Sequence, residues 1–157
     1  MLKHAWYLIT DHNYWADSDA HPHWPQADGL ANTLTELFGD QAGLSAAQTA
    51  TAVQAMLRLA EHLSGAIAEA SVTVPDRAQF ARLLHALNLL TAYLAQITGR
   101  LADQVRTDTG TDLSTLRPQD RQATATTLAA ACRQLEHTAA AYGLAHLTTR
   151  AFGGAPR

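Results

Sequence analysis

The feature that most constrains the fold of this chain is the run from Phe80 to Val105, in which large apolar residues recur every three or four positions. This spacing is that of one face of an α-helix, and no turn signal in the run is strong enough to interrupt it. The apolar positions are Phe80, Leu84, Leu87, Leu90, Leu94, Ile97, Leu101 and Val105. We therefore expect a long amphipathic helix over 75–107, with the rest of the chain covering it.

Capping signals place three further helices. Asp28 is a plausible N-cap for a short helix over 28–38, which Gly39 ends. Ser45 and Gln48 have the spacing of a capping box and begin an alanine-rich helix over 45–71. Pro118 opens the last long helix, over 118–150.

Together these signals predict an all-α fold. We expect an antiparallel helical bundle of three long helices plus one short N-terminal helix, in a single domain over 1–157. An irregular leader over 1–27, rich in aromatic and histidine residues, is expected to pack on the bundle.

Composition excludes several classes of protein. With 47% hydrophobic and 16% charged residues, the 157-residue chain is typical of a globular protein. A net charge of −3 without a basic stripe argues against nucleic-acid binding. The apolar runs are too short for a membrane span, and the N-terminus lacks the pattern of a secretory signal, so we expect a cytoplasmic protein. The single lysine and the abundance of Ala, Leu and Thr indicate a high-GC bacterial genome.

Cys132 is the only cysteine, so no intrachain disulfide can form. It falls in the alanine-rich pattern of the last helix, where a small buried hydrophobe is the simplest interpretation. A catalytic thiol would need a base partner, and the sequence shows none.

The face opposite the apolar stripe of the central helix is the predicted interaction surface. It carries Arg82, His85, Leu89, Tyr93, Gln96 and Arg100. Leu89 and Tyr93 lie one turn apart and need a cover. That cover is either the leader or a second subunit in a homodimer, and we favour the leader because its tryptophans also need burial.

The leader holds the alternative sites. Asp17, Asp19, His21 and His23 could bind a divalent metal such as zinc, because imidazole and carboxylate both suit that ion. Trp6, Trp15, Trp24 and Tyr14 could line a pocket for a small molecule. No cysteine pair or HExxH motif accompanies these residues, so we prefer a packing role for them and expect no cofactor.

The long helices carry four more histidines without a motif that predicts chemistry. His137 and His146 are nine residues apart, which places them on different faces of a helix and not in one metal site with His62. His85 is not followed by the Lys-Gly pair expected of a phosphotransfer histidine. Neither a P-loop nor a nucleophile motif occurs, and we find no catalytic residue.

The sequence therefore favours a non-enzymatic helical protein that acts through protein–protein contact, in regulation or assembly, with self-association as one form of that contact. The alternative hypothesis is a bundle that binds a small molecule or a metal through the leader, which would leave room for an enzyme.

Overall fold

The computed structural model describes residues 6–7, 26–39, 45–68, 77–107 and 115–151. Four helices occupy these ranges: α1 (Gln26–Phe38), α2 (Ala46–Ala68), α3 (Arg77–Thr107) and α4 (Pro118–Ala151). No strand occurs within them. The prediction of an all-α fold is confirmed for this part of the chain, and each predicted helix is found, with bounds within a few residues of those expected. The positions 69–71 and 75–76, also expected to be helical, lie outside the described residues.

The chain divides into two compact units, which we describe separately. One contains Met1–Ala16 and Val74–Arg157, and thus α3 and α4; the other is Asp17–Thr73, with α1 and α2. The single domain and the antiparallel bundle of all the helices remain predictions.

In the unit of α1 and α2, the capping box is confirmed. The Ser45 main-chain N–H donates to Gln48 Oε1 at 2.9 Å, and the Gln48 main-chain N–H donates to Ser45 Oγ at 3.2 Å. The end of α1 at Phe38 is also confirmed, with the Gly39 N–H bonded to the Thr35 carbonyl at 2.6 Å. The N-cap assigned to Asp28 is wrong, because α1 begins two residues earlier, at Gln26. An acidic residue in the first turn stabilises a helix through its dipole without capping it.

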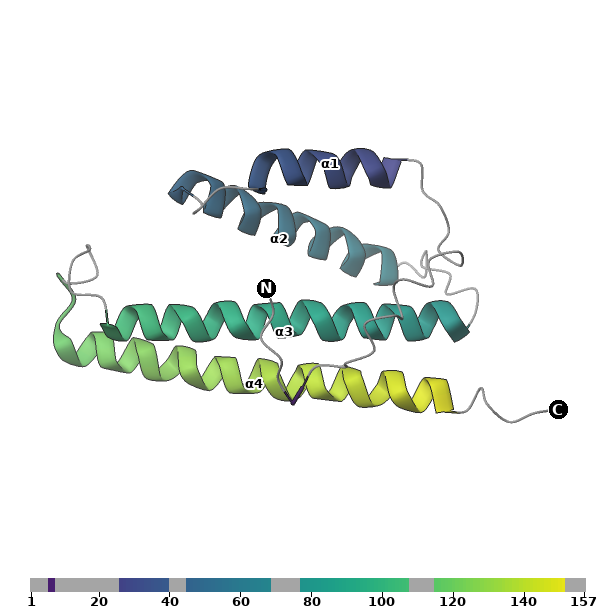
Figure 1. Ribbon diagram of the computed structural model, residues 1–157. Helices are drawn as coiled ribbons and strands as arrows, with labels where there is room; N and C mark the ends of the chain where they lie inside the picture. The colour runs from purple at the N-terminus through teal and green to yellow at the C-terminus, as the bar shows by residue number, and fades with distance from the viewer. Residues whose placement is uncertain (1–5, 8–25, 40–44, 69–76, 108–114, 152–157) are drawn as a thin grey trace. The chain divides into compact units, whose positions relative to one another are not determined.

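In the other unit, α3 and α4 lie side by side (Figure 1). Ala81 contacts His146, Asn88 contacts Ala139, and Ala95 contacts Cys132. From one of these contacts to the next, the residue number increases by seven in α3 and decreases by seven in α4. The two helices are therefore antiparallel, in a register that repeats every heptad.

Residues that are mostly small, with His85 and Asn88 as the exceptions, form the face of α3 that meets α4. They recur at alternating steps of four and three residues: Ala81, His85, Asn88, Ala92, Ala95, Gly99 and Ala102. Of these, Ala92 and Ala95 are fully buried. On α4 the matching positions are spaced by seven residues, at Ala125, Cys132, Ala139 and His146. Small side chains allow two helices to approach closely, so alanine and not leucine fills this interface.

This packing differs from the sequence-based expectation for the apolar stripe of α3. Of its eight residues, Leu84 and Val105 are buried, whereas Phe80, Leu90, Ile97 and Leu101 are exposed. The count of large apolar residues pointed to one face of α3, and α4 packs on another. A periodic pattern of hydrophobic residues is dominated by large side chains. The contact of α3 with α4 depends instead on alanine, because small side chains allow the two helices to approach closely.

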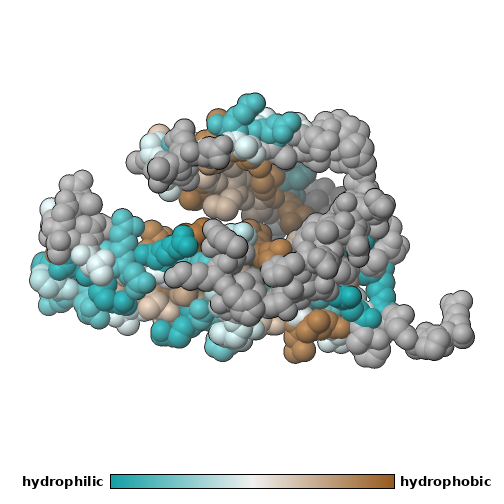
Figure 2. Space-filling model, in the orientation of Figure 1, coloured by the Kyte–Doolittle hydropathy of each residue, from teal (hydrophilic) through white to brown (hydrophobic). Residues whose placement is uncertain are grey.

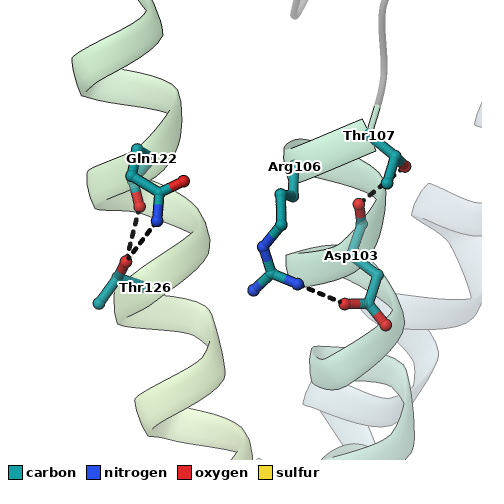
Figure 3. A network of polar contacts seen from close by, with 5 residues as sticks. All are labelled: Asp103, Arg106, Thr107, Gln122 and Thr126. Carbon is teal, nitrogen blue, oxygen red and sulfur yellow. Dashed lines mark hydrogen bonds and ion pairs between the residues drawn. The ribbon is translucent and has the colours of Figure 1, made fainter.

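Where α3 ends and α4 begins, the polar contacts drawn in Figure 3 stay within one helix each. Arg106 Nη1 donates to Asp103 Oδ1 at 2.9 Å, and Gln122 Nε2 donates to Thr126 Oγ1 at 3.5 Å. Such exposed contacts add little to stability. At this end the pairing of α3 with α4 rests on buried small residues such as Ala102 and Ala125.

Candidate interaction surface

A second heptad pattern on α3 consists of large apolar residues that α4 does not cover. We call it the leucine seam, and it alternates steps of three and four residues through Phe80, Leu83, Leu87, Leu90, Leu94, Ile97 and Leu101. At about 100° per residue, the seam lies roughly 140° around α3 from the face that meets α4. α3 therefore carries two heptad patterns, one of small residues and one of large residues.

Within the unit of α3 and α4, the leucine seam is left uncovered by α4. Four of its side chains are close to half exposed: Phe80 at 42%, Leu90 at 49%, Ile97 at 46% and Leu101 at 46%. The three others, Leu83, Leu87 and Leu94, are partly exposed. Covering a half-exposed side chain of this size stabilises by roughly 1 kcal/mol, so burial of the whole seam is worth several kcal/mol. Figure 2 shows hydrophobic surface interspersed with hydrophilic surface on the visible face of the molecule.

The seam is also free of charge along its length. No Asp, Glu, Lys or Arg occurs from Leu83 to Gly99. The charged residues that bracket this stretch, Arg82 and Arg100, are on the face of Tyr93, roughly 110° around the helix from the seam. A large, apolar and uncharged strip of this kind is typical of the core of a protein–protein interface.

The interaction surface predicted from the sequence lies on a third face of α3. His85 of this set is 2% exposed and sits in the interface with α4. Tyr93 and Arg100 are exposed, and Arg82, Leu89 and Gln96 are partly exposed. The set therefore spans the edge of the α3–α4 interface and open surface, and its role in binding remains a prediction.

Residues 6 and 7 of the leader lie against this pair of helices, whereas residues 26 and 27, expected to be irregular, begin α1 in the other unit. Tyr7 is buried with Ala92 and Ala139, and its carbonyl oxygen accepts a hydrogen bond from Asn88 Nδ2 at 2.8 Å. Trp6 is 66% exposed and packs edge-on against Tyr7 and His137, with ring centroids 5.6 Å apart in both cases. Of the predicted pocket residues, Trp15, Trp24 and Tyr14 lie outside the described residues.

The predicted metal ligands Asp17, Asp19, His21 and His23 also lie outside the described residues. Within the ranges that the structure describes, no group of three or more His, Cys, Asp or Glu side chains is placed to hold a metal ion. The metal hypothesis therefore stays a prediction about the leader.

A buried histidine pair is the feature that sequence reasoning missed. His85 on α3 and His146 on α4 are almost fully buried, with ring centroids 5.3 Å apart and the rings tilted by 49°. His146 Nδ1 lies 2.8 Å from the Ala81 carbonyl oxygen and donates to it, because a carbonyl only accepts. The only sign of this pair in the sequence is that each histidine occupies a position in the heptad pattern of its own helix. That these two positions face each other follows only from the register of α3 against α4.

Cys132 occupies the same interface. Its thiol donates to the Ala95 carbonyl at 3.2 Å, and a Cβ added at Gly99 would lie 3.3 Å from its sulfur. Partial burial, with the negative charge of Glu136 as a smaller cause, raises the pKa of the Cys132 thiol. A thiol that keeps its proton is a poor nucleophile, in agreement with the packing role expected from the sequence.

Comparison with protein-family models, with curated proteins and with solved structures finds no match to this chain. Among the described residues, no helix combines the length and the apolar character needed to cross a membrane.

Proposed function

We propose that this chain acts through protein–protein contact, with the leucine seam of α3 as the binding surface. The observation that carries the proposal is the exposure of four large apolar side chains, Phe80, Leu90, Ile97 and Leu101, along one uncharged face of a long helix. Monomeric proteins rarely leave a contiguous apolar strip of this length open.

The secondary structure of α3 also supports a binding role. The helix runs without interruption for 31 residues, from Arg77 to Thr107, and its pairing with α4 leaves the seam on a rigid support. A helix held in this way loses little conformational entropy when a partner binds it. The mode of recognition that fits is helix packing, in which a partner helix places its own apolar residues between those of the seam.

We infer in addition that the helices belong to an antiparallel bundle, as the sequence predicts. Support comes from the antiparallel pairing of α3 with α4 and from the apolar side chains that α2 exposes, Val53, Met56, Leu57, Leu59 and Leu63. Helices with apolar stripes reach stability by burying them against further helices.

The proposal is tested by site-specific photo-crosslinking in the cell. A photoreactive phenylalanine analogue is placed at Leu90 or Ile97 on the seam, or at Arg133 on the exposed side of α4 as a control. We expect adducts between separate protein chains from the two seam positions and none from Arg133. Adducts confined to a single chain, or equal labelling at all three positions, would contradict a binding role for the seam.

A further inference from the structure

We propose that the occupant of the leucine seam is a second copy of this chain, so that two α3 helices pack antiparallel across a two-fold axis near Leu90. The inference rests on the proposed function, because it names the partner of the same surface. Two properties of the seam carry it, its spacing and its lack of charge, and its length sets the strength of the dimer.

The spacing makes the seam complementary to itself. In an antiparallel pair, a two-fold axis near Leu90 sets Leu87 of one copy against Leu90 of the other, and Leu83 against Leu94. Further from the axis, Phe80 meets Ile97. Each of these layers joins two large apolar side chains, and Leu101 lies beyond the last of them, because its opposite position in this register is 76, outside the seam.

The lack of charge removes the usual obstacle to self-association. An interface between identical surfaces brings the same residues close together, and charged side chains there would repel their own copies. The stretch from Leu83 to Gly99 has no charged residue, and Arg82 and Arg100 are turned roughly 110° away from the seam. Two copies can therefore meet along the seam without like charges facing each other.

The length of the seam limits the dimer to weak, reversible association. From Phe80 to Leu101 the helix rises about 32 Å, and its diameter with side chains is about 10 Å. If a neighbouring helix covers a third of the circumference, the two copies bury roughly 700 Å² in total, which is below the range of stable specific interfaces and in the range of weak association. We therefore expect a dimer that dissociates on dilution.

Single cysteines test the antiparallel geometry. They are introduced into the full chain in a Cys132→Ser background, in which the hydroxyl can still donate to the Ala95 carbonyl. With a short bismaleimide, Leu90→Cys should link to itself across the axis. Phe80→Cys should not, because its two copies lie about 26 Å apart, whereas a mixture of Phe80→Cys and Ile97→Cys should link. Arg133→Cys on the exposed side of α4 is the control for random collision.

The outcomes separate the dimer from its alternatives. Self-linking of Phe80→Cys as readily as Leu90→Cys would indicate parallel helices and overturn the proposed geometry. A protein that sediments as a monomer at all concentrations would overturn the dimer, and the proposed function would still stand if photo-crosslinking from Leu90 joins a different protein. A monomer in which Leu90→Cys is protected from maleimide would overturn both proposals.

A charge substitution gives a second and independent measurement. Leu90→Asp places two carboxylates near the axis, so we expect the dimer dissociation constant from sedimentation to rise at least tenfold, with the helical circular dichroism kept. Arg133→Asp is the matched control and should leave the dissociation constant unchanged. An unchanged dissociation constant for Leu90→Asp would overturn the proposal.

Discussion

The side chain of Asn88 donates a hydrogen bond of 2.7 Å to the main-chain carbonyl of Ala139 on the neighbouring helix. The same amide nitrogen donates to the Tyr7 carbonyl at 2.8 Å, so one buried amide joins α3, α4 and the leader. A side chain reaches the main chain of another helix only where the two helices lie close together. The hydrogen bonds of Asn88 therefore require the small residues around it, which let α3 and α4 approach. In turn, these hydrogen bonds fix the register of α3 against α4.

This contact predicts a large effect for a nearly isosteric change. Asn88→Asp replaces the donating amide with a carboxylate that faces two carbonyl oxygens, and we expect it to lower the free energy of unfolding by about 3 kcal/mol. Gln104→Glu is the matched control, the same exchange of amide for acid at an exposed position of α3, and should change stability by less than about 0.5 kcal/mol. Urea denaturation followed by circular dichroism measures both. Equal effects of the two substitutions would show that the Asn88 contacts do not hold the interface.

The short distance between Gly99 and Cys132 predicts that the effects of substitutions at these two positions on stability are not additive. Alanine is favoured over glycine in a helix by about 1 kcal/mol, but a Cβ at Gly99 would lie only 3.3 Å from the Cys132 sulfur. We expect Gly99→Ala to stabilise the Cys132→Ala variant by about 1 kcal/mol and the wild type by clearly less. A double-mutant cycle by urea denaturation measures the difference.

The control for this cycle is Gly65→Ala in α2. A Cβ there would meet nothing within 4 Å, so the substitution should give a gain of about 1 kcal/mol whether or not Cys132 is changed. Additive effects of Gly99→Ala and Cys132→Ala would contradict close contact of α3 and α4 at this point.

The raised pKa of the Cys132 thiol predicts how stability depends on pH. The folded protein holds the thiol proton more tightly than the unfolded chain does, because burial disfavours the thiolate. Its contribution to stability is therefore complete below about pH 8.5, the ordinary thiol pKa, and is lost as the pH rises through the pKa of the folded state. In Cys132→Ser this alkaline loss should be absent, which a comparison of urea midpoints from pH 7 to pH 10 detects.

The same property predicts slow reaction of Cys132 with iodoacetamide. We expect the folded protein to be alkylated more slowly at pH 7.5 than the protein in urea, since the thiolate is the reacting form and the thiol is partly buried. Alkylation at the same rate in both states would contradict the packing of Cys132 against α3.

The capping box at the start of α2 predicts a local effect. Ser45→Ala removes the acceptor for the Gln48 N–H and should cost about 1 kcal/mol of stability. Thr51→Ala, which removes only a hydroxyl bonded to the Ala47 carbonyl within the helix, should cost nothing and gain up to about 0.7 kcal/mol from helix propensity. Thermal or urea unfolding of the full chain, followed by circular dichroism, measures the change in stability that each substitution causes. A cost for Thr51→Ala as large as that for Ser45→Ala would contradict a capping role.

How much could be read from the sequence differs between local and tertiary features. The all-α class, the four helices to within a few residues, the capping box and the glycine that ends α1 were predicted and found. Each depends on residues within about one helical turn of one another, so the information lies in a short stretch of chain. The failed N-cap at Asp28 is of the same kind, because an acid in the first turn and an acid at the cap look alike in a sequence.

The sequence by itself thus determined that α3 is a long helix with a strip of large apolar residues along it. Only the tertiary structure decided that α4 packs against the alanine face of that helix, that His85 meets His146, and that α4 leaves the leucine seam uncovered. The physical reason is that alanine contributes little to hydrophobic periodicity, yet it allows the closest helix contact. The register of α3 against α4 depends on both helices together. The residue pattern of one helix alone therefore does not specify it.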